Sequence, residues 1–302
     1  MKYLTNLRQR NPTRCGGVLG ALMSLRLTFR SLPEIVHLCS ALLCHTDAVE
    51  IQSIIIFLFV ILFGSYVQSV AGFAMGMTIV AVVGGLRLLD IPTLAAVVSL
   101  MTIVNTTFSL RGQLQHVHRR LLFFIGLGQL PGIFIGLWLL GYLDAEDSRT
   151  LELCLGIFIT VGGLAMTIRP RAMKEVSGGF FAWVSGLLGG LLGGMFSASG
   201  PVLGWFGYSQ PLAVNVIRAT LLSSFFMTTS TRTLVVGVQG GLTDSVLTYA
   251  ALGVPAVLLG AWLGKAFPPL VSEDVLKRGA FFILLLMGVW ICFSALQPLP
   301  AS

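Results

Sequence analysis

The chain has 302 residues, of which 55% are hydrophobic and only 10% are charged, and its mean hydropathy is +0.90. Soluble domains carry about 25% charged residues, so this composition excludes a soluble globular enzyme. The net charge of +7 indicates membrane orientation and contact with anionic lipid, because no basic stripe interleaved with aromatic residues suggests nucleic-acid binding. We therefore expect an all-helical integral membrane protein that contacts lipid and binds no nucleic acid.

Residues 1–50 form a basic N-terminal extension whose first 33 residues contain no acid. Three interpretations stay open: a cytoplasmic extension, an organellar transit peptide, or a start placed too far upstream. Two histidines and two cysteines crowd near its end, but their spacing matches no zinc pattern (His37, Cys39, Cys44, His45). We expect neither a metal nor a cofactor.

From Ile51 onward the chain falls into charge-poor stretches, which can be compared with the about 20 residues that a spanning helix needs. The stretches predict about eight transmembrane helices, at 51–86, 91–110, 121–143, 151–168, 176–217, 211–236, 245–267 and 279–295. Two of them are too long. As one helix, residues 51–86 would measure about 54 Å against a hydrocarbon core of about 30 Å, so this segment must be interrupted.

The eight spans divide into two four-helix repeats, residues 51–175 and 176–302. The third span of each repeat carries proline, glycine and tryptophan at one constant offset (Pro131/Pro255, Gly136/Gly260, Trp138/Trp262). Agreement at three landmarks in the same order is hard to obtain from apolar composition alone, so we interpret the pattern as an internal duplication.

The loops predict an orientation. Basic residues follow the second and fourth spans, and acidic residues follow the third. The positive-inside rule then puts the N-terminus, the 111–120 loop and the 169–175 connector in the cytoplasm. Four crossings per repeat is an even number, so the repeats are expected to run in parallel, with the C-terminus also inside.

The first helix of each repeat is expected to be interrupted, at Gln68–Gly76 and at Gly189–Pro201, where glycine, serine and proline disfavour a continuous helix. Backbone freed at membrane depth must be buried in protein or line a watery cavity. Matched interruptions therefore point to a transport site near the bilayer midplane, and helix N-termini there favour an anion. The predicted substrate-binding residues at the breaks are Gln68, Ser69, Gly72, Gly76, Ser197, Ser199 and Gly200.

Arg218 is expected to be the only charge well within an otherwise apolar span. An intramembrane arginine costs about 2.5–3.5 kcal/mol on insertion scales and usually faces a pathway or a partner. Its planar fork suits an oxyanion, so we expect Arg218 to bind the substrate together with Asn215, three residues earlier on the same helix face. Asn105 and Gln129 either line the path or join helices, and both readings stay open.

These features resemble the sulfite exporter TauE/SafE family of membrane permeases. The resemblance rests on the duplicated four-span plan, on the run G-L-L-G-G-L-L-G-G-M-F-S-A-S-G-P and on R-A-T-L at 218–221, and it covers about 51–296. The first break departs from the family's Gly-Gly pair, since it reads A-G-F-A-M-G. The resemblance implies transport of sulfite or of sulfur-containing organic anions across a bacterial-type inner membrane.

The sequence holds no P-loop, no His-Glu-x-x-His and no Gly-x-Ser-x-Gly, so we expect a permease rather than an enzyme. Two rivals are a non-transporting membrane subunit that recruits partners and an intramembrane enzyme, which would lack a mid-span histidine to activate Ser197 or Ser199. The anion transported, the direction, the coupling ion and the oligomeric state, including a homo-oligomer, stay open.

Overall fold

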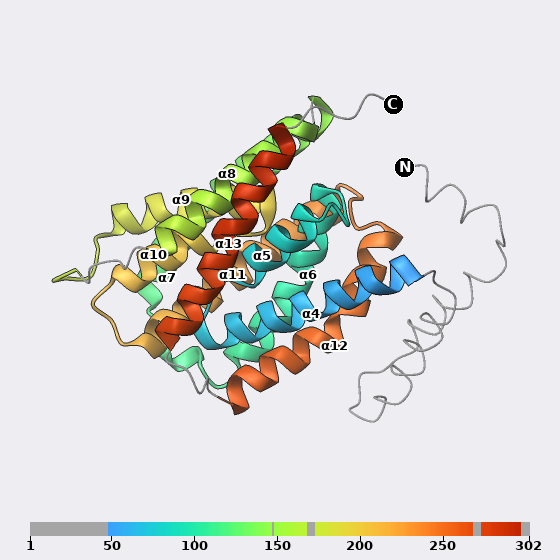
Figure 1. The fold of residues 1–302 in the computed structure, drawn as a ribbon. Coiled ribbons are helices and arrows are strands. Elements are labelled where there is room, and N and C mark those ends of the chain that lie inside the picture. The colour runs from blue at the N-terminus through green and yellow to red at the C-terminus, as the bar shows by residue number, and fades with distance from the viewer. Residues whose placement is uncertain (1–47, 147, 168–172, 268–272, 297–302) are drawn as a thin grey trace. The chain divides into compact units, whose positions relative to one another are not determined.

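A computed structural model describes residues 48–146, 148–167, 173–267 and 273–296 (Figure 1). The regular elements of this part are all helical, and it contains no strand. In chain order they are α4 (Ala48–Ala71), α5 (Met75–Ile79), the π-helix η1 (Val80–Gly84), α6 (Ile91–Leu110), the 3-10 helix η2 (Leu114–His116), α7 (Arg119–Glu146), α8 (Ser148–Thr167), α9 (Gly179–Phe196), α10 (Gly200–Ser209), α11 (Val214–Val238), α12 (Asp244–Ala266) and α13 (Glu273–Leu296). The extension up to residue 47, with the two histidines and two cysteines near its end, lies outside the described residues.

Five of the described helices are long and apolar enough to cross a membrane: Gln52–Ala71, Ile91–Leu110, Arg119–Ala145, Gly179–Phe196 and Asp244–Ala266. The chain is therefore a multi-pass integral membrane protein, as its composition predicts. Helix α6 matches its expected span at both ends. The Asp90 carboxylate accepts the Thr93 N–H at 3.0 Å, and Pro92 occupies the first turn, so the start is fixed by local chemistry.

Both over-long segments are broken within the predicted windows. Helix α4 ends at Ala71 and α5 begins at Met75, and α9 ends at Phe196 before α10 begins at Gly200. Backbone φ is positive within each break, at +81° for Gly72, 97° for Ala74 and 55° for Ser197. A left-handed conformation is costly for the alanine and the serine, so tertiary packing must hold both breaks in place.

Helices α7 and α9 pack closely in the same direction. A Cβ added to Gly128 would lie 2.8 Å from the Leu187 amide nitrogen, and one added to Gly136 would lie 3.0 Å from that of Met195. Each step of eight residues along α7 therefore matches eight along α9. Glycine at these positions lets the two backbones approach, which is how helices associate in lipid.

Helices α4 and α12 form an equivalent parallel pair. The Ser65 hydroxyl donates to the Val257 carbonyl at 2.6 Å, and the Ser69 hydroxyl donates to Ala261 O at 3.1 Å. Gly260 gives α12 its close approach, because an added Cβ there would lie 2.9 Å from the Ser65 Cβ. Figure 1 shows α4 and α12 side by side.

Further contacts fix the direction of the other helices. The Lys265 ammonium donates to the Phe108 carbonyl at 2.7 Å, so α6 and α12 end at the same end of the bundle. The Thr160 side chain lies beside Gly288, and the Arg149 guanidinium donates to the Ala295 carbonyl, which makes α8 and α13 antiparallel. We call the end that holds the loop 111–118 the loop end, and the other the opposite end.

Each broken segment turns back on itself. The Met173 N–H donates to Ser209 O at 2.9 Å, and the Ser177 N–H donates to Gln210 Oε1 at 2.8 Å. The chain therefore enters α9 and leaves α10 at the same end. In the first half, α4 and α6 both run parallel to α12, so they start at the same end. The segment α5–η1 must return there before α6 begins at Ile91.

One prediction is consequently wrong. Helix α6 ends at the loop end, whereas α11, the helix expected in the same place of the second repeat, begins there, so the expected parallel arrangement of the two halves does not hold. Helix α11 runs in the direction of α7, since the His118 N–H donates to Thr220 Oγ1 and the Gln129 amide donates to Thr228 Oγ1. The N-terminus, which was predicted to share a compartment with the 111–118 loop, lies outside the described residues.

Candidate functional site

The two breaks meet inside the bundle. A Cβ added to Gly76 would lie under 3.0 Å from the carbonyl oxygen of Ser197, and one added to Gly200 would lie 3.6 Å from the Ala74 amide nitrogen. Gly76, in the first turn of α5, therefore contacts the second break, and Gly200, at the start of α10, contacts the first break. Residues about 120 positions apart in the chain are brought together at one point.

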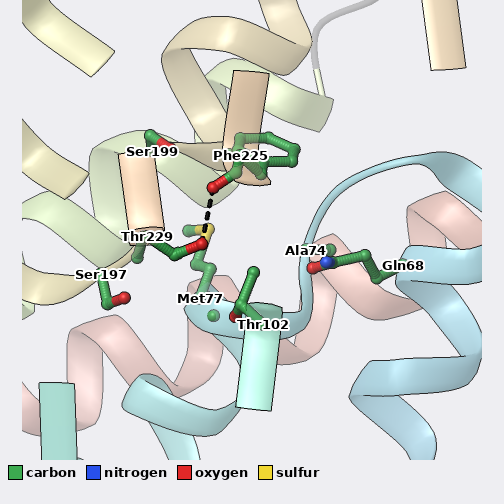
Figure 2. Close-up of a pocket in the computed structure, with 11 residues that line it drawn as sticks. Gln68, Ala74, Met77, Thr102, Ser197, Ser199, Phe225 and Thr229 are labelled. Carbon is green, nitrogen blue, oxygen red and sulfur yellow. Dashed lines mark hydrogen bonds between the residues drawn. The ribbon is translucent and has the colours of Figure 1, made fainter. Parts of the chain in front are cut away.

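A small cavity lies at this junction. Its walls come from both breaks and from the middles of α6 and α11, and Figure 2 draws the residues that line it: Gln68, Ala74, Gly76, Met77, Thr102, Ser197, Ala198, Ser199, Gly200, Phe225 and Thr229.

Two buried donors in this wall have no hydrogen-bond partner. The Gln68 side chain is 2% exposed and Thr102 is 4% exposed, yet the Gln68 Nε2 and the Thr102 Oγ1 are both unpaired. The other end of the amide is engaged, because Gln68 Oε1 accepts the N–H of Met75 at 3.2 Å. Buried polar groups are normally satisfied, so these two side chains, which line one cavity (Figure 2), leave hydrogen-bonding capacity unused in its wall.

Other polar groups in the wall already have partners. The Ser197 hydroxyl lies 2.8 Å from that of Ser99, and the Thr229 hydroxyl donates to Phe225 O at 2.7 Å, the bond dashed in Figure 2. Ser199 stands directly before α10, whose first N–H groups have no partner within the helix. These groups add acceptors, donors and a positive helix end to the cavity.

Four of the predicted site residues lie elsewhere. Ser69 points to α6 and α12, where its hydroxyl lies 2.8 Å from that of Ser109. Gly72 packs against the backbone and the aliphatic stem of Arg218, which is half-buried near the start of α11. Asn215 is exposed, and its side-chain oxygen accepts the N–H of Val216. The wall thus includes five of the predicted residues, namely Gln68, Gly76, Ser197, Ser199 and Gly200.

The two undecided amides join helices. Asn105 Nδ2 donates to the hydroxyl of Ser65, and Gln129 Nε2 donates to the hydroxyls of Ser224 and Thr228 at 2.9 and 2.6 Å. Neither Asn105 nor Gln129 lines the cavity. Their contacts connect α6 to α4 and α7 to α11, which is the interhelical role of polar residues in lipid.

Sequence reasoning missed Arg232, which is 1% exposed. Its Nε donates to Gly194 O at 2.9 Å and its Nη1 to Ser99 Oγ at 2.9 Å. The criterion that singled out Arg218, a charge within an apolar span, applies equally to Arg232. Thr102, Phe225 and Thr229 were also missed, and nothing in their local sequence separates them from other residues of α6 and α11.

The described residues contain no cluster of three His, Cys, Asp or Glu side chains that could hold a metal ion.

Comparison with known proteins identifies the relatives of this chain. The family model described as sulfite exporter TauE/SafE matches residues 56–291. A Cupriavidus necator protein described as "Probable sulfite/organosulfonate exporter TauE" is 39% identical over 234 residues, covering 78% of this chain and 91% of that protein. No solved structure matches the chain. The chain belongs to the sulfite exporter TauE/SafE family of membrane transporters, and it is not an enzyme.

Proposed function

We propose that this protein moves small sulfur-containing anions, sulfite or organosulfonates, across the membrane through the cavity between the two breaks. The observation that carries the proposal is the pair of buried, unpaired donors, Gln68 Nε2 and Thr102 Oγ1, in the wall of that cavity. The printed name of the Cupriavidus necator relative supports sulfite and organosulfonate as the substrate class.

The donor chemistry suits an anion that must be released again. A sulfite or sulfonate group presents three oxygens, each of which accepts hydrogen bonds from neutral amides, hydroxyls and backbone N–H groups. The residues that line the cavity carry no acid and no base of their own. A site of neutral donors binds an oxyanion firmly enough to select it and weakly enough to let it leave.

The architecture supports two inverted repeats, residues 51–175 and 176–302, with eight long helices, α4, α6, α7, α8, α9, α11, α12 and α13, in the membrane. Two contacts between the halves come in equivalent pairs. Helix α7 packs on α9 through Gly136, as α12 packs on α4 through Gly260, and these glycines are one of the landmark pairs of the duplicated sequence. Gly72 contacts Arg218, as Ser197 contacts Ser99. Inverted repeats with interrupted helices are typical of transporters that alternate access to a central site.

Charge supports an orientation with the loop end in the cytoplasm of a bacterial-type inner membrane. Arg111, Arg119, Arg120 and Lys174 lie near the loop end, which the positive-inside rule assigns to the cytoplasm. Lys265 lies close enough to Arg218 and Arg111 for their charges to repel. Within this proposal Arg218 attracts anions to the entrance, and Asn215 lies exposed beside it.

Substrate counterflow in proteoliposomes tests the proposal without knowledge of the transport direction or the coupling ion. Vesicles loaded with unlabelled sulfite should accumulate labelled sulfite, and vesicles without protein should not. Taurine and acetate panels separate sulfonates from carboxylates. A wild-type protein that exchanges none of the sulfur anions contradicts the proposal and favours the non-transporting subunit.

Matched variants connect the activity to the cavity. Thr102→Val removes an unpaired hydroxyl at constant shape, and a hydrogen bond to a charged ligand is worth about 1.5–3 kcal/mol, or about tenfold or more in affinity. Thr107→Val, an exposed threonine on the same helix, should change nothing. Gln68→Glu puts a carboxylate where the anion binds, and Gln113→Glu makes the same change on the exposed loop. Equal exchange by all four variants would remove the cavity from the pathway.

A further inference from the structure

Arg232 carries its charge deep inside the bundle. It lies in the last third of α11. Of the charged side chains whose burial the structure describes, Arg232 alone is buried. Burying a charged side chain is strongly unfavourable unless the charge is paired and hydrogen-bonded. A sequence retains such a group only if something compensates it.

The compensation within the chain is partial. The ion pair found among the described residues joins Arg87 to Glu152, and no carboxylate of this part lies within 4.0 Å of Arg232. The Nε of Arg232 donates to Gly194 O in the last turn of α9, where the helix dipole supplies about half a negative charge. Part of the positive charge is left for another anion.

A chain of hydroxyls joins this guanidinium to the cavity. Arg232 Nη1 donates to Ser99 Oγ at 2.9 Å, and Ser99 Oγ lies 2.8 Å from Ser197 Oγ, which lines the cavity. Ser99 Oγ also lies 2.8 Å from the carbonyl of Ala95. The single hydroxyl proton of Ser99 can therefore be donated in a hydrogen bond to Ala95 O or to Ser197 Oγ, but not to both.

The position of that proton depends on the cavity. When Ser99 donates its hydrogen bond to Ala95 O, Ser197 donates to Ser99, and only the lone pairs of the Ser197 hydroxyl oxygen face the cavity. With an anion present, Ser99 turns its proton to Ser197, and Ser197 turns its own proton to the anion. Every donor from Arg232 to the ligand then points in one direction, and hydrogen bonds aligned in this way strengthen each other.

We propose that Arg232 is the counter-charge of the transported anion, coupled to it through the hydroxyls of Ser99 and Ser197. This inference rests on the proposed function and adds to it the residue that makes the cavity selective for negative charge. Arg218, near the loop end, guides anions to the protein, whereas Arg232 stabilises the anion once it is in the cavity.

A purely structural role makes the opposite prediction for stability. If Arg232 only capped α9, Arg232→Gln would destabilise the protein and leave its affinity for sulfite unchanged. As a counter-charge without a full partner, Arg232 costs stability in the ligand-free protein, so Arg232→Gln should unfold at the same or a higher temperature. The ligand-dependent rise in unfolding temperature, which reports affinity, should shrink.

The experiment measures that rise with sulfite for purified protein in detergent. Arg232→Gln should bind sulfite about 10- to 100-fold more weakly, since the positive charge that orients the hydroxyl chain toward the anion is lost. Arg232→Lys, which keeps the charge, should recover part of the loss. Ser99→Ala cuts the hydroxyl chain and should weaken binding about 3- to 10-fold, whereas Ser223→Ala removes a hydroxyl of α11 that donates only to Ala219 of its own helix and should leave binding unchanged.

The outcomes separate this inference from the proposed function. Wild-type protein that no sulfur anion stabilises overturns the proposed substrate. Normal wild-type binding with unchanged affinity in Arg232→Gln overturns the role of Arg232 alone. If Arg232→Gln does not accumulate in the membrane, Ser99→Ala decides, because wild-type affinity in that variant overturns the coupling.

Discussion

Gly76 offers a direct test of the way the two breaks meet. Its backbone φ is not positive, so alanine can adopt it, and only space decides the outcome of Gly76→Ala. The added Cβ would lie under 3.0 Å from the Ser197 carbonyl oxygen, whereas ordinary contacts begin at 3.4 Å. The breaks would have to separate by more than 0.4 Å, the difference between these two values, and the obstacle is backbone rather than a side chain that can rotate away.

The expected cost follows from overpacking, which destabilises by about 1–3 kcal/mol. Replacing a helical glycine by alanine returns about 0.5–1 kcal/mol, so Gly76→Ala should lower stability by about 1–2 kcal/mol and reduce transport as the cavity distorts. Gly200→Ala is the matched control. It lines the same cavity and starts α10, but its added Cβ would make an ordinary contact at 3.6 Å.

Thermal unfolding in detergent and sulfite counterflow at equal reconstituted amounts measure the two consequences. The expected result is a lowered unfolding temperature and weak exchange in Gly76→Ala, with Gly200→Ala at least as stable as wild type. Equal stability and equal exchange of the two variants would refute the close contact of the breaks, and with it the cavity built on that contact.

Three further predictions concern charge and direction. Arg218→Gln should slow sulfite exchange most at low ionic strength and leave the sulfite affinity within about threefold, because long-range attraction is screened by salt; an effect independent of salt would contradict this role. Single cysteines in a cysteine-free background, at Gln113 and Lys174 near the loop end, should react with an impermeant reagent from one side of the membrane, and one at Gln239 from the other; labelling of all three from one side would contradict the inverted arrangement. Glu152→Gln breaks the partly exposed ion pair with Arg87. This change should lower the free energy of unfolding by no more than about 1 kcal/mol, and by less at high salt. A larger loss would mean that the pair anchors the return of the first broken segment.

Local chemistry made the helices and their interruptions predictable. Helix α6 begins at Ile91 because Asp90 caps it and Pro92 fits its first turn. The breaks follow from length, since 36 uncharged residues are too many for one spanning helix, and from the glycine, serine and proline that disfavour a continuous helix there. No such signal gives the direction of the chain after a break. That direction depends on contacts between distant residues, such as Met173 with Ser209, and the assumption of a single crossing led to the wrong orientation of the halves.

The same limit applies to the site. Gln68 and Ser69 are neighbours in the sequence and looked equivalent, but adjacent helical residues point about 100° apart. Gln68 faces the cavity, whereas Ser69 lies four residues from Ser65 and shares its face toward α12. The helix register that separates them is set by tight packing on α12. Thr102 is one of several small polar residues of α6, and only the meeting of the two breaks distinguishes it.

The arrangement of donors suggests how binding and access are linked. Gln68 belongs to the first broken segment and Ser199 to the second, while Thr102 and Thr229 belong to the continuous helices α6 and α11. The two broken segments enter from opposite ends of the bundle. Displacement of one break would therefore open the cavity toward one end, while the donors of the other segment stay in place. A ligand can favour a conformation only by binding it more tightly than its alternatives. An anion that is held by donors from both segments would therefore favour the arrangement in which both breaks line the cavity. Withdrawal of the donors of one segment would release the anion toward one side.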